Sequence, residues 1–338
     1  MTILYLFRSS GTGHSIEHLF DTIRCEIEEA GIQTKAVRLP HISRGVRTVW
    51  QNLRFVKQLT ASVFHITGDV HYLALALPAS RTVLTIHDCS LLKNNRHRPL
   101  RYAIFWLFWY YLPIRRAGVV TAVSGKTRQE LLRYVGPIAH KVKVVPNACD
   151  PTLMASPGVF YHAKPILLQI GTAPHKNLPS LIAAIEGISC TLVIVGPLTK
   201  EIRAELHQRQ IDFRQYVDLS REAIVQLYTA CDIVTFVSTY EGFGMPILEA
   251  NAIGRAIITS DVSPMREVAA EAALLVNPTN IPAIRAGISR LIHDDIYRQH
   301  LIEEGLRNAQ CYTVELAAHR YQSLYEQGCP SLSAQPVI

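Results

Sequence analysis

Short, uninterrupted runs of apolar and often β-branched residues recur along almost the whole chain, separated by segments of helical spacing. Because these runs do not alternate with polar residues, they are typical of parallel strands buried on both faces. Segment 16–27 is apolar at helical spacing and Gly31 follows it, as a glycine just beyond a helix end would. This alternation predicts an α/β protein with doubly wound parallel sheets. The runs are 2–7, 62–66, 82–86, 119–123 and 141–145, and then 165–170, 191–195, 232–237, 256–259 and 273–276.

Two such series occur in 338 residues, a length that suits two domains of ordinary size. Residues 150–163 contain two prolines and a glycine and have no clear period, so we expect the boundary there. The first domain is therefore expected at 1–150 and the second at 164–310. In open parallel sheets ligands bind beyond the carboxyl ends of the strands, so two facing sheets would line one cleft.

Composition narrows the class of partner. The formal charge of +7 favours polyanionic partners such as nucleotide phosphates or an anionic membrane face. The Lys and Arg residues look scattered and no nucleic-acid motif appears, so a nucleic acid is not expected. The seven cysteines are odd in number and contain no CxxC pair, which argues against a disulfide framework or a zinc site. Buried thiols in a reducing, cytoplasmic compartment are the simpler interpretation.

The apolar segments favour a chain without a membrane span. The N-terminal run stops at Arg8 and resembles a first strand more than a signal peptide. The longest apolar stretch, 102–112, falls short of the ~20 residues that cross a bilayer. The wider segment 98–116 combines aromatic residues with arginines at both ends. It fits either a helix at a membrane surface or a helix buried in the first domain.

The most informative segment is STYEGFGMPILEA, residues 238–250, which follows the run 232–237. Glu241 and Glu249 are separated by seven residues, and Pro246 suits the first turn of a helix. Gly242 and Gly244 would let backbone N–H groups approach a phosphate at the helix N-terminus. Glu241 could accept hydrogen bonds from sugar hydroxyls, and Glu249, about two turns into the helix, could reach a ribose. The alternative is a turn and a helix with two solvated glutamates.

The same segment resembles the Glu-x7-Glu signature of glycosyltransferase family 4, which is retaining and has the GT-B fold of two facing Rossmann-like domains. PILLQIGTAPHKNLPSLIAAI and ITSDVSPMREVAAEAALLVNP also resemble segments of that family in the expected order. In the first half, TVLTIHDCSLL, VVTAVSGKTRQELLRY and VKVVPNACD do so as well. The resemblance covers roughly residues 80–325. It implies acceptor binding by the first domain, donor binding by the second, and a last helix, about 311–327, packed back on the first domain.

The resemblance implies roles for residues that are ambiguous on their own. Lys176 matches the lysine that neutralises the donor diphosphate, although a lone loop lysine is usually solvated. The preceding position, often Arg in relatives, is His175 here, and Gly171 is followed by Thr172 where another branch has Arg. His87 is placed beside the donor sugar, with Asp88 a less specific neighbour. From the residues alone this pair could equally be a base with its orienting carboxylate or a capped strand end.

The remaining expected donor-site residues lie in loops after strands. Gly11 and Gly13 follow the first run in SSGTGHS, a partial GxGxxG that lacks its third glycine because residue 16 is Ile. The resemblance places this loop at the donor phosphates, and a plain tight turn is the alternative. Asn147 matches an Asn-Gly-x-Asp turn in which Ala148 replaces the glycine. Phe243 and Met245 belong to the signature segment and are expected at the donor.

The reaction implied is the transfer of a hexose-like sugar from a nucleotide-diphosphate sugar, UDP or GDP, to an acceptor hydroxyl with retention. The acceptor would be a glycan or a lipid-linked glycan, reached in the cytoplasm, with peripheral contact to the inner face of a membrane. No Asp-x-Asp follows a strand, so neither a metal nor another cofactor is expected. Two alternatives stay open: another GT-B reaction such as nucleotide-sugar epimerisation, and a noncatalytic partner subunit that keeps the fold.

Overall fold

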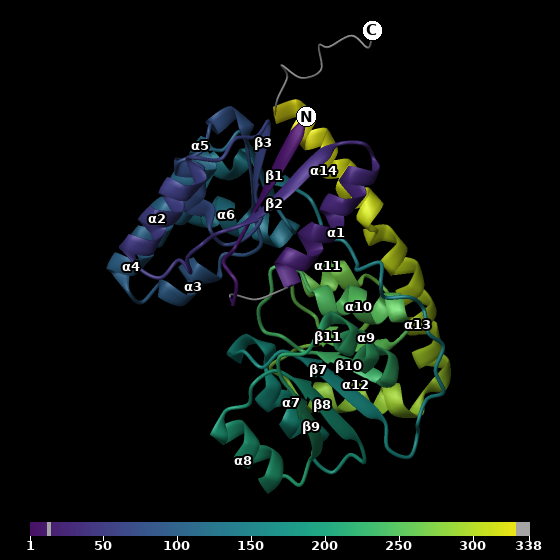
Figure 1. Ribbon diagram of the computed structural model, residues 1–338. Coiled ribbons are helices and arrows are strands. Elements are labelled where there is room, and N and C mark those ends of the chain that lie inside the picture. The colour runs from purple at the N-terminus through teal and green to yellow at the C-terminus, as the bar shows by residue number, and fades with distance from the viewer. Residues whose placement is uncertain (12–14, 329–338) are drawn as a thin grey trace. The chain divides into compact units, whose positions relative to one another are not determined.

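The two series of apolar runs form two separate six-stranded sheets, each with parallel strands (Figure 1). The computed structural model describes residues 1–11 and 15–328. The chain divides into two compact units: unit 1 comprises Met1–Ala148 and the segment from Val314 onward, and unit 2 comprises Cys149–Thr313. The predicted α/β class with doubly wound parallel sheets is confirmed.

In unit 1 the strand order is β2-β1-β3-β4-β5-β6, and every neighbouring pair is parallel. The strands are β1 (Thr2–Phe7), β2 (Gln33–Arg38), β3 (Val63–Ile66), β4 (Thr82–Ile86), β5 (Val119–Ala122) and β6 (Lys143–Val144). The helices are α1 (Ser15–Glu29), α2 (Val46–Val56), α3 (Ser90–Asn95), α4 (Pro99–Phe105), α5 (Leu112–Arg116), α6 (Gly125–Val135) and α14 (Val314–Gly328). Short turns of helix are η1 (His71–Leu75), η2 (Ala79–Arg81), the π-helical η3 (Trp106–Tyr111) and η4 (Gly136–Lys141).

Both faces of this sheet are buried, as the unalternated runs predict. In β1, Ile3 and Tyr5 lie in the core formed with α1 and α14, while Leu4 and Leu6 lie in the core on the other face. Successive side chains of a strand point to opposite faces, so a fully apolar strand suits a sheet covered on both sides. Helix α1 ends at Glu29, and Gly31 follows with φ +85°, which confirms the predicted C-terminal glycine.

A chain of buried polar groups joins α14 to the middle of the unit 1 sheet. The Tyr325 hydroxyl lies 2.7 Å from His65 Nδ1 and 3.1 Å from the Tyr5 hydroxyl. His65 Nε2 lies 2.8 Å from Thr85 Oγ1, which in turn lies 3.3 Å from the Tyr321 hydroxyl. Burial lowers the pKa of His65 to about 3, so the ring is neutral at pH 7. A neutral imidazole has one donor and one acceptor nitrogen, and both nitrogens have partners here.

In unit 2 the strand order is β12-β11-β10-β7-β8-β9, again parallel throughout. The strands are β7 (Ile166–Ile170), β8 (Thr191–Val195), β9 (Asp212–Tyr216), β10 (Ile233–Phe236), β11 (Ala256–Ser260) and β12 (Leu274–Val276). The helices are α7 (Leu178–Ile185), α8 (Lys200–Gln208), α9 (Arg221–Ala230), α10 (Met245–Ile253), α11 (Met265–Ala269), α12 (Ile281–His293) and α13 (Asp295–Ala309), with short turns η5 (Pro174–Lys176) and η6 (Gln310–Tyr312).

The order of strands reverses between β7 and β10, because β8 and β9 continue on one side and β11 and β12 on the other. At such a point the loops that leave the two adjacent strands turn to opposite faces of the sheet, which opens a crevice at their carboxyl ends. The residues that the sequence singles out in this unit lie in the loops after β7 and β10 and on α10, the helix that follows the second loop.

Two features differ from expectation. Strand β9 is not among the predicted runs, because it is an edge strand of sequence DFRQY that alternates exposed and half-buried residues. The aromatic segment 102–112 is not one regular helix but passes from α4 through the π-helical η3 into α5. Within residues 1–11 and 15–328, no helix is both long and apolar enough to cross a membrane.

Removing the Tyr325 hydroxyl should destabilise unit 1. Tyr325→Phe leaves His65 Nδ1 and the Tyr5 hydroxyl without that partner in a fully buried site, and we expect a loss of about 1–3 kcal/mol. Denaturant unfolding followed by circular dichroism measures the loss. Tyr161→Phe is the control, because that ring is 62% exposed. Equal stability of the two variants would show that the buried hydroxyl network contributes nothing.

Candidate functional site

The ends of β7 and β10 bring a lysine and a glutamate together. These strands are parallel neighbours, so the loops that follow them leave the sheet at the same edge. Lys176, at the end of η5, donates from Nζ to Glu241 Oε1 at 2.7 Å. The two side chains are only 17% and 14% exposed. Nζ also lies 4.8 Å from the centroid of the Phe236 ring, a cation–π distance. The lysine ammonium is therefore held in place and partly shielded from water.

Other contacts connect these two loops. The carbonyl oxygen of His175 accepts a hydrogen bond from the backbone N–H of Thr239 at 2.8 Å. The His175 ring is 43% exposed, and its Nε2 lies 3.9 Å from Glu241 Oε1. Gly171 has φ +87°, and a Cβ there would lie 3.0 Å from Cε of Lys176. A glycine at position 171 thus leaves the space through which the lysine side chain runs.

The glycine-rich segment ends at the N-terminus of α10. Gly244 is the N-cap residue with φ +123° and has no side chain to accept hydrogen bonds from the first turn. Pro246 lies in that turn, as predicted. The Phe243 side chain is only 5% exposed and packs against Tyr312, so this residue can face a ligand mainly through its backbone. The N–H groups at the start of a helix can donate hydrogen bonds to an anion, and no side chain of Gly244 competes for them.

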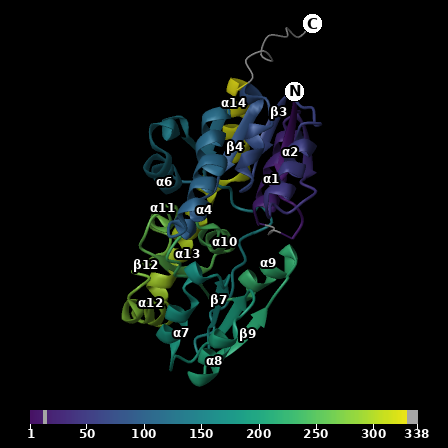
Figure 2. The same ribbon diagram turned by 90° about the vertical axis from the view of Figure 1, so that its left-hand side faces the viewer.

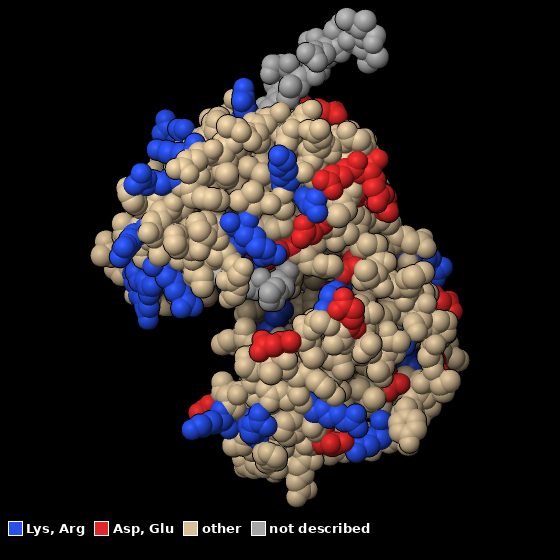
Figure 3. Space-filling model, viewed as in Figure 1, with Lys and Arg blue, Asp and Glu red and all other residues tan. Residues whose placement is uncertain are grey.

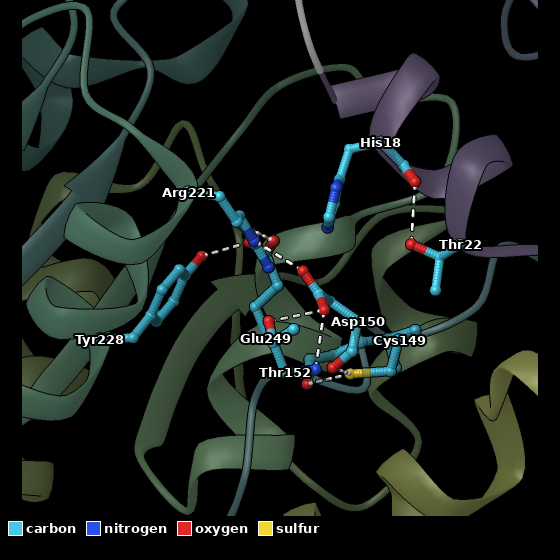
Figure 4. A network of polar contacts seen from close by, with 9 residues as sticks. His18, Thr22, Cys149, Asp150, Thr152, Arg221, Tyr228 and Glu249 are labelled. Atoms are coloured by element: carbon cyan, nitrogen blue, oxygen red, sulfur yellow. Dashed lines mark hydrogen bonds and ion pairs between the residues drawn. The ribbon is translucent and has the colours of Figure 1, made fainter. Parts of the chain in front are cut away.

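Glu249 is a buried residue of α10, and Figure 4 shows it beside Arg221 and Tyr228. It is the fifth residue of α10, so it lies little more than one turn into the helix and not the two turns that the spacing suggested. Its Oε1 accepts from Arg221 Nη1 at 2.9 Å, and its Oε2 accepts from the Tyr228 hydroxyl at 2.6 Å. Burial, followed by the charge of Glu249, raises the pKa of Tyr228 well above its usual range. Tyr228 therefore stays a hydrogen-bond donor at neutral pH.

Arg221 links Glu249 to a second carboxylate. Arg221 Nε donates to Asp150 Oδ2 at 2.6 Å, and Asp150 Oδ1 accepts from the backbone N–H and the hydroxyl of Thr152. Burial lowers the pKa of Arg221, but the charges of Glu249 and Asp150 outweigh burial and leave the pKa above its usual value. Its remaining nitrogen, Nη2, is buried and has no hydrogen-bond partner among the residues that the structure describes. One guanidinium thus holds two carboxylates in place (Figure 4).

The sequence interpretation missed Asp150, Arg221 and Tyr228. Arg221 offers one signal in retrospect: it follows Ser220, the N-cap of α9, and so places a cation in the first turn of a helix. Because the helix dipole disfavours a cation there, an arginine in that position indicates a compensating carboxylate partner. Asp150 is the aspartate of the Asn-Gly-x-Asp turn, but the sequence interpretation gave it no role in the site. Tyr228 carries no comparable signal, since a buried tyrosine is common in any fold.

In unit 1, His87 follows β4 and is held by the neighbouring strand end. Its Nε2 lies 2.7 Å from the carbonyl oxygen of Thr67, which can only accept, so Nε2 carries the proton. Burial lowers the pKa of His87, and the ring is neutral at pH 7. The other nitrogen, Nδ1, is then a hydrogen-bond acceptor. This geometry suits a contact with a sugar hydroxyl.

The other predicted residues of unit 1 are less informative. The Asp88 carboxylate accepts from the backbone N–H of Ser90 at 2.7 Å, which is the capping arrangement that the sequence left open. Gly11 has φ +81°, as a tight turn requires. Gly13 lies outside the described residues. Asn147 is buried at the end of the unit.

Within residues 1–11 and 15–328, no group of three or more His, Cys, Asp or Glu side chains is placed so that it could hold a metal ion. The charged groups of the unit 2 site are the cations Lys176 and Arg221 and the carboxylates Glu241, Glu249 and Asp150.

Two protein families match the chain in succession. Residues 12–153 match the family described as Glycosyltransferase Family 4, and residues 155–307 match Glycosyl transferases group 1. The first match covers most of unit 1 and the second covers nearly all of unit 2. Together they span most of the chain.

The individual curated relatives are similar to this chain at low sequence identity. O-antigen chain mannosyltransferase B of Escherichia coli is 27% identical over 260 residues, which cover 70% of this chain and 67% of that protein. Serotype-specific mannosyltransferase WbdA of Escherichia coli is 24% identical over 268 residues, which cover 71% of this chain. The match spans only 32% of WbdA.

Solved structures match over nearly the whole length. Sucrose-phosphate synthase of Thermosynechococcus elongatus superposes with a TM-score of 0.81 at 17% identity, covering 98% of this chain and 100% of that one. HepE of Anabaena in complex with UDP-glucose superposes with a TM-score of 0.72 at 18% identity, covering 99% and 100%. These likenesses confirm the expected GT-B fold.

Breaking the arginine bridge should destabilise unit 2. Arg221→Gln leaves two largely buried carboxylates without their cation, and we expect a loss of about 2–4 kcal/mol. Combining it with Glu249→Gln should cost less than the sum of the two single changes, since one stranded charge is then removed. Thermal unfolding measures each effect. Arg266→Gln is the control, because its pair with Asp261 is exposed, and it should leave the melting temperature unchanged. A loss as small as that of the control would contradict a structural role for Arg221.

Proposed function

Because the chain belongs to glycosyltransferase family 4, we propose that it transfers a hexose-like sugar from a nucleotide-diphosphate sugar to an acceptor hydroxyl with retention of configuration. The observation that carries this proposal is the Lys176–Glu241 contact at the reversal point of the unit 2 sheet, beside the N-terminus of α10. An ammonium and helix N–H groups at one place suit the diphosphate of such a donor.

The diphosphate is the leaving group of the proposed reaction. The bond between the anomeric carbon and the terminal phosphate oxygen breaks, and the acceptor oxygen forms its bond on the same face. The acceptor proton passes to the departing phosphate oxygen, so no side chain is needed as the base. Lys176 Nζ has three N–H groups, and Glu241 accepts one of them. The others are left for phosphate oxygens, whose negative charge grows as the bond breaks.

The two glutamates have different tasks in this proposal. Glu241 holds Lys176 and contacts the transferred sugar, while Glu249 contacts the ribose of the donor. Each carboxylate oxygen has two acceptor sites, so Glu249 can hold Arg221 and Tyr228 and still accept from ribose hydroxyls. Arg221 and Tyr228 are then positioning residues, because they fix the orientation of Glu249. Gly171, Gly242, Gly244 and Met245 complete the proposed donor site.

Unit 1 is proposed to receive the acceptor, with His87 Nδ1 accepting from a hydroxyl of the transferred sugar. The relatives named as O-antigen and serotype-specific mannosyltransferases favour a glycan or lipid-linked glycan as the acceptor and mannose as the first sugar to test. HepE, solved with UDP-glucose, keeps a UDP-sugar in consideration. The described cysteines are free thiols, which supports a reducing, cytoplasmic compartment. Nucleotide-sugar epimerisation, one of the two alternatives that the sequence leaves open, would be recognised by a product that forms without an acceptor.

A donor panel tests the proposal directly. Thermal unfolding with UDP-glucose, GDP-mannose, ADP-glucose and dTDP-glucose should single out one nucleotide. A donor at 100 times its Kd should stabilise the protein by about 2.7 kcal/mol. Because Lys176 supplies the cation, the shift and the turnover should persist in EDTA. A requirement for added magnesium or manganese would contradict the proposed metal independence, and no shift with any donor would contradict the proposed function.

Lys176 and Glu249 should differ in their kinetic effects. Lys176→Ala should lower kcat by about 100-fold or more, because its contact strengthens as the diphosphate leaves. Glu249→Ala should mainly raise the donor KM, because the ribose changes little during the reaction. Glu241→Ala should affect both constants. Lys200→Ala, an exposed lysine at the start of α8, is the control and should behave as wild type. Unchanged turnover in Lys176→Ala would make His175 the next candidate for the cation.

A further inference from the structure

Two helices of unit 1 expose large apolar side chains to solvent. Val46 and Trp50 of α2 are 87% and 54% exposed. On the α4–η3 segment, Leu100, Ile104 and Phe108 are 74%, 43% and 42% exposed, and they recur every four residues. We call these five side chains the apolar face. Residues four apart lie on the same side of a helix, so the α4 part of the face forms a row.

The opposite side of the α4–η3 segment is anchored in the unit. Trp106 Nε1 donates to the carbonyl of Tyr134 at 2.9 Å, and Trp109 Nε1 donates to that of Asp69 at 3.0 Å. Tyr110 is only 1% exposed. Most aromatic rings that made the segment look apolar all round are therefore used for packing. The side chains left outside are chiefly aliphatic, with Phe108 among them.

Tyr72 of η1 contacts both helices. The Tyr72 ring lies 4.9 Å from that of Trp109, and the Tyr72 hydroxyl accepts from the side-chain amide of Asn52 on α2 at 3.0 Å. Figures 1 and 2 place α2 and α4 on the same side of unit 1, which faces the viewer in Figure 2. Packing contacts therefore fix the inner sides of both helices, and the apolar face lies on their outer sides.

Basic residues surround the apolar face. Between residues 42 and 115 the only acidic residues are Asp69 and Asp88. In Figure 3 the Lys and Arg side chains gather along this margin of unit 1, while Asp and Glu lie toward its other margin. Lys and Arg side chains thus gather on the side of unit 1 that carries the two helices, which come from a stretch of sequence with few acidic residues. The exposed basic residues of the two helices and their flanks include Arg44, Arg47, Arg54, Lys57, Lys93, Arg96, Arg98 and Arg101.

We propose that this face docks on the surface of a bilayer that contains anionic lipids. Amphipathic helices with large apolar residues on one face and Lys or Arg beside them bind at the level of the headgroups. Each basic side chain near such a surface adds about fivefold to the affinity, and a buried leucine adds about tenfold or more. An acidic protein partner would also meet the arginines. The five apolar side chains stand exposed on two separate helices, and this arrangement suits lipid better than a protein surface that must match their shape.

Vesicle sedimentation tests this inference without using the enzymatic reaction, so it can fail independently of the proposed function. The full chain is mixed with vesicles of phosphatidylcholine alone and with vesicles that contain a third of phosphatidylglycerol. We expect binding to the anionic vesicles only, falling steeply as salt is raised from 50 to 500 mM, because salt screens exposed charges. No binding to anionic vesicles at low salt would overturn the inference.

Matched variants locate the surface. Leu100→Glu and Phe108→Glu should each weaken vesicle binding by about tenfold or more, and Arg101→Gln by about fivefold. Ile296→Glu, on an 87% exposed isoleucine of α13 in unit 2, adds the same charge elsewhere and should bind nearly as wild type. Circular dichroism checks folding. Equal losses in Ile296→Glu and Phe108→Glu would overturn the assignment to this face. So would sedimentation-velocity data showing a wild-type dimer that Phe108→Glu dissociates, since the face would then be covered by a second copy.

Discussion

The parallel pairing of β7 with β10 is the constraint on which the site in unit 2 depends. The register aligns Leu167 with Ile233 and Gln169 with Thr235, so both strands end at the same edge of the sheet. The order of strands reverses between them, so the loops that follow border one crevice at that edge. Lys176 and Glu241, 65 residues apart in sequence, come within 2.7 Å because their loops start at this shared edge. An antiparallel arrangement would place their loops at opposite edges.

Each unit also contains a polar network buried in an otherwise apolar interior. In unit 1, Tyr325 and His65 tie α14 to strands whose sequence positions are more than 200 residues away. In unit 2, Arg221 ties Asp150, at the start of the unit, to Glu249 on α10. Buried polar groups are costly unless they are paired, so such networks permit one arrangement of their elements and disfavour others. The unit 2 network includes Glu249 of the proposed site and fixes the orientation of its carboxylate, as binding requires.

Local sequence was sufficient wherever a local rule operates. The central strands β4 and β8 were predicted with their observed bounds because they are buried on both faces and read as continuous apolar runs. Gly31 and Pro246 marked a helix end and a helix start because φ preferences act within one or two residues. Strand β9 was not predicted because an edge strand keeps one face in water and therefore has no continuous apolar run. For His87 and Asp88, the sequence could not show that the Thr67 carbonyl contacts His87 Nε2 or that the Asp88 carboxylate accepts from the Ser90 N–H, because both contacts depend on how the strand ends and turns around them fold.

The sequence by itself determined the α/β class, the two series of strands, the family and the principal candidates Lys176, Glu241 and Glu249. These follow from periodicity and from ordered motifs, which are properties of the chain read in one direction. Only the tertiary structure decided that Arg221 and Tyr228 hold Glu249, that His87 presents Nδ1 as an acceptor, and that apolar side chains of α2 and the α4–η3 segment face outward. The physical reason is the same in each case: a contact between distant segments depends on which strands pair and which helix faces turn outward, and no local preference encodes that choice.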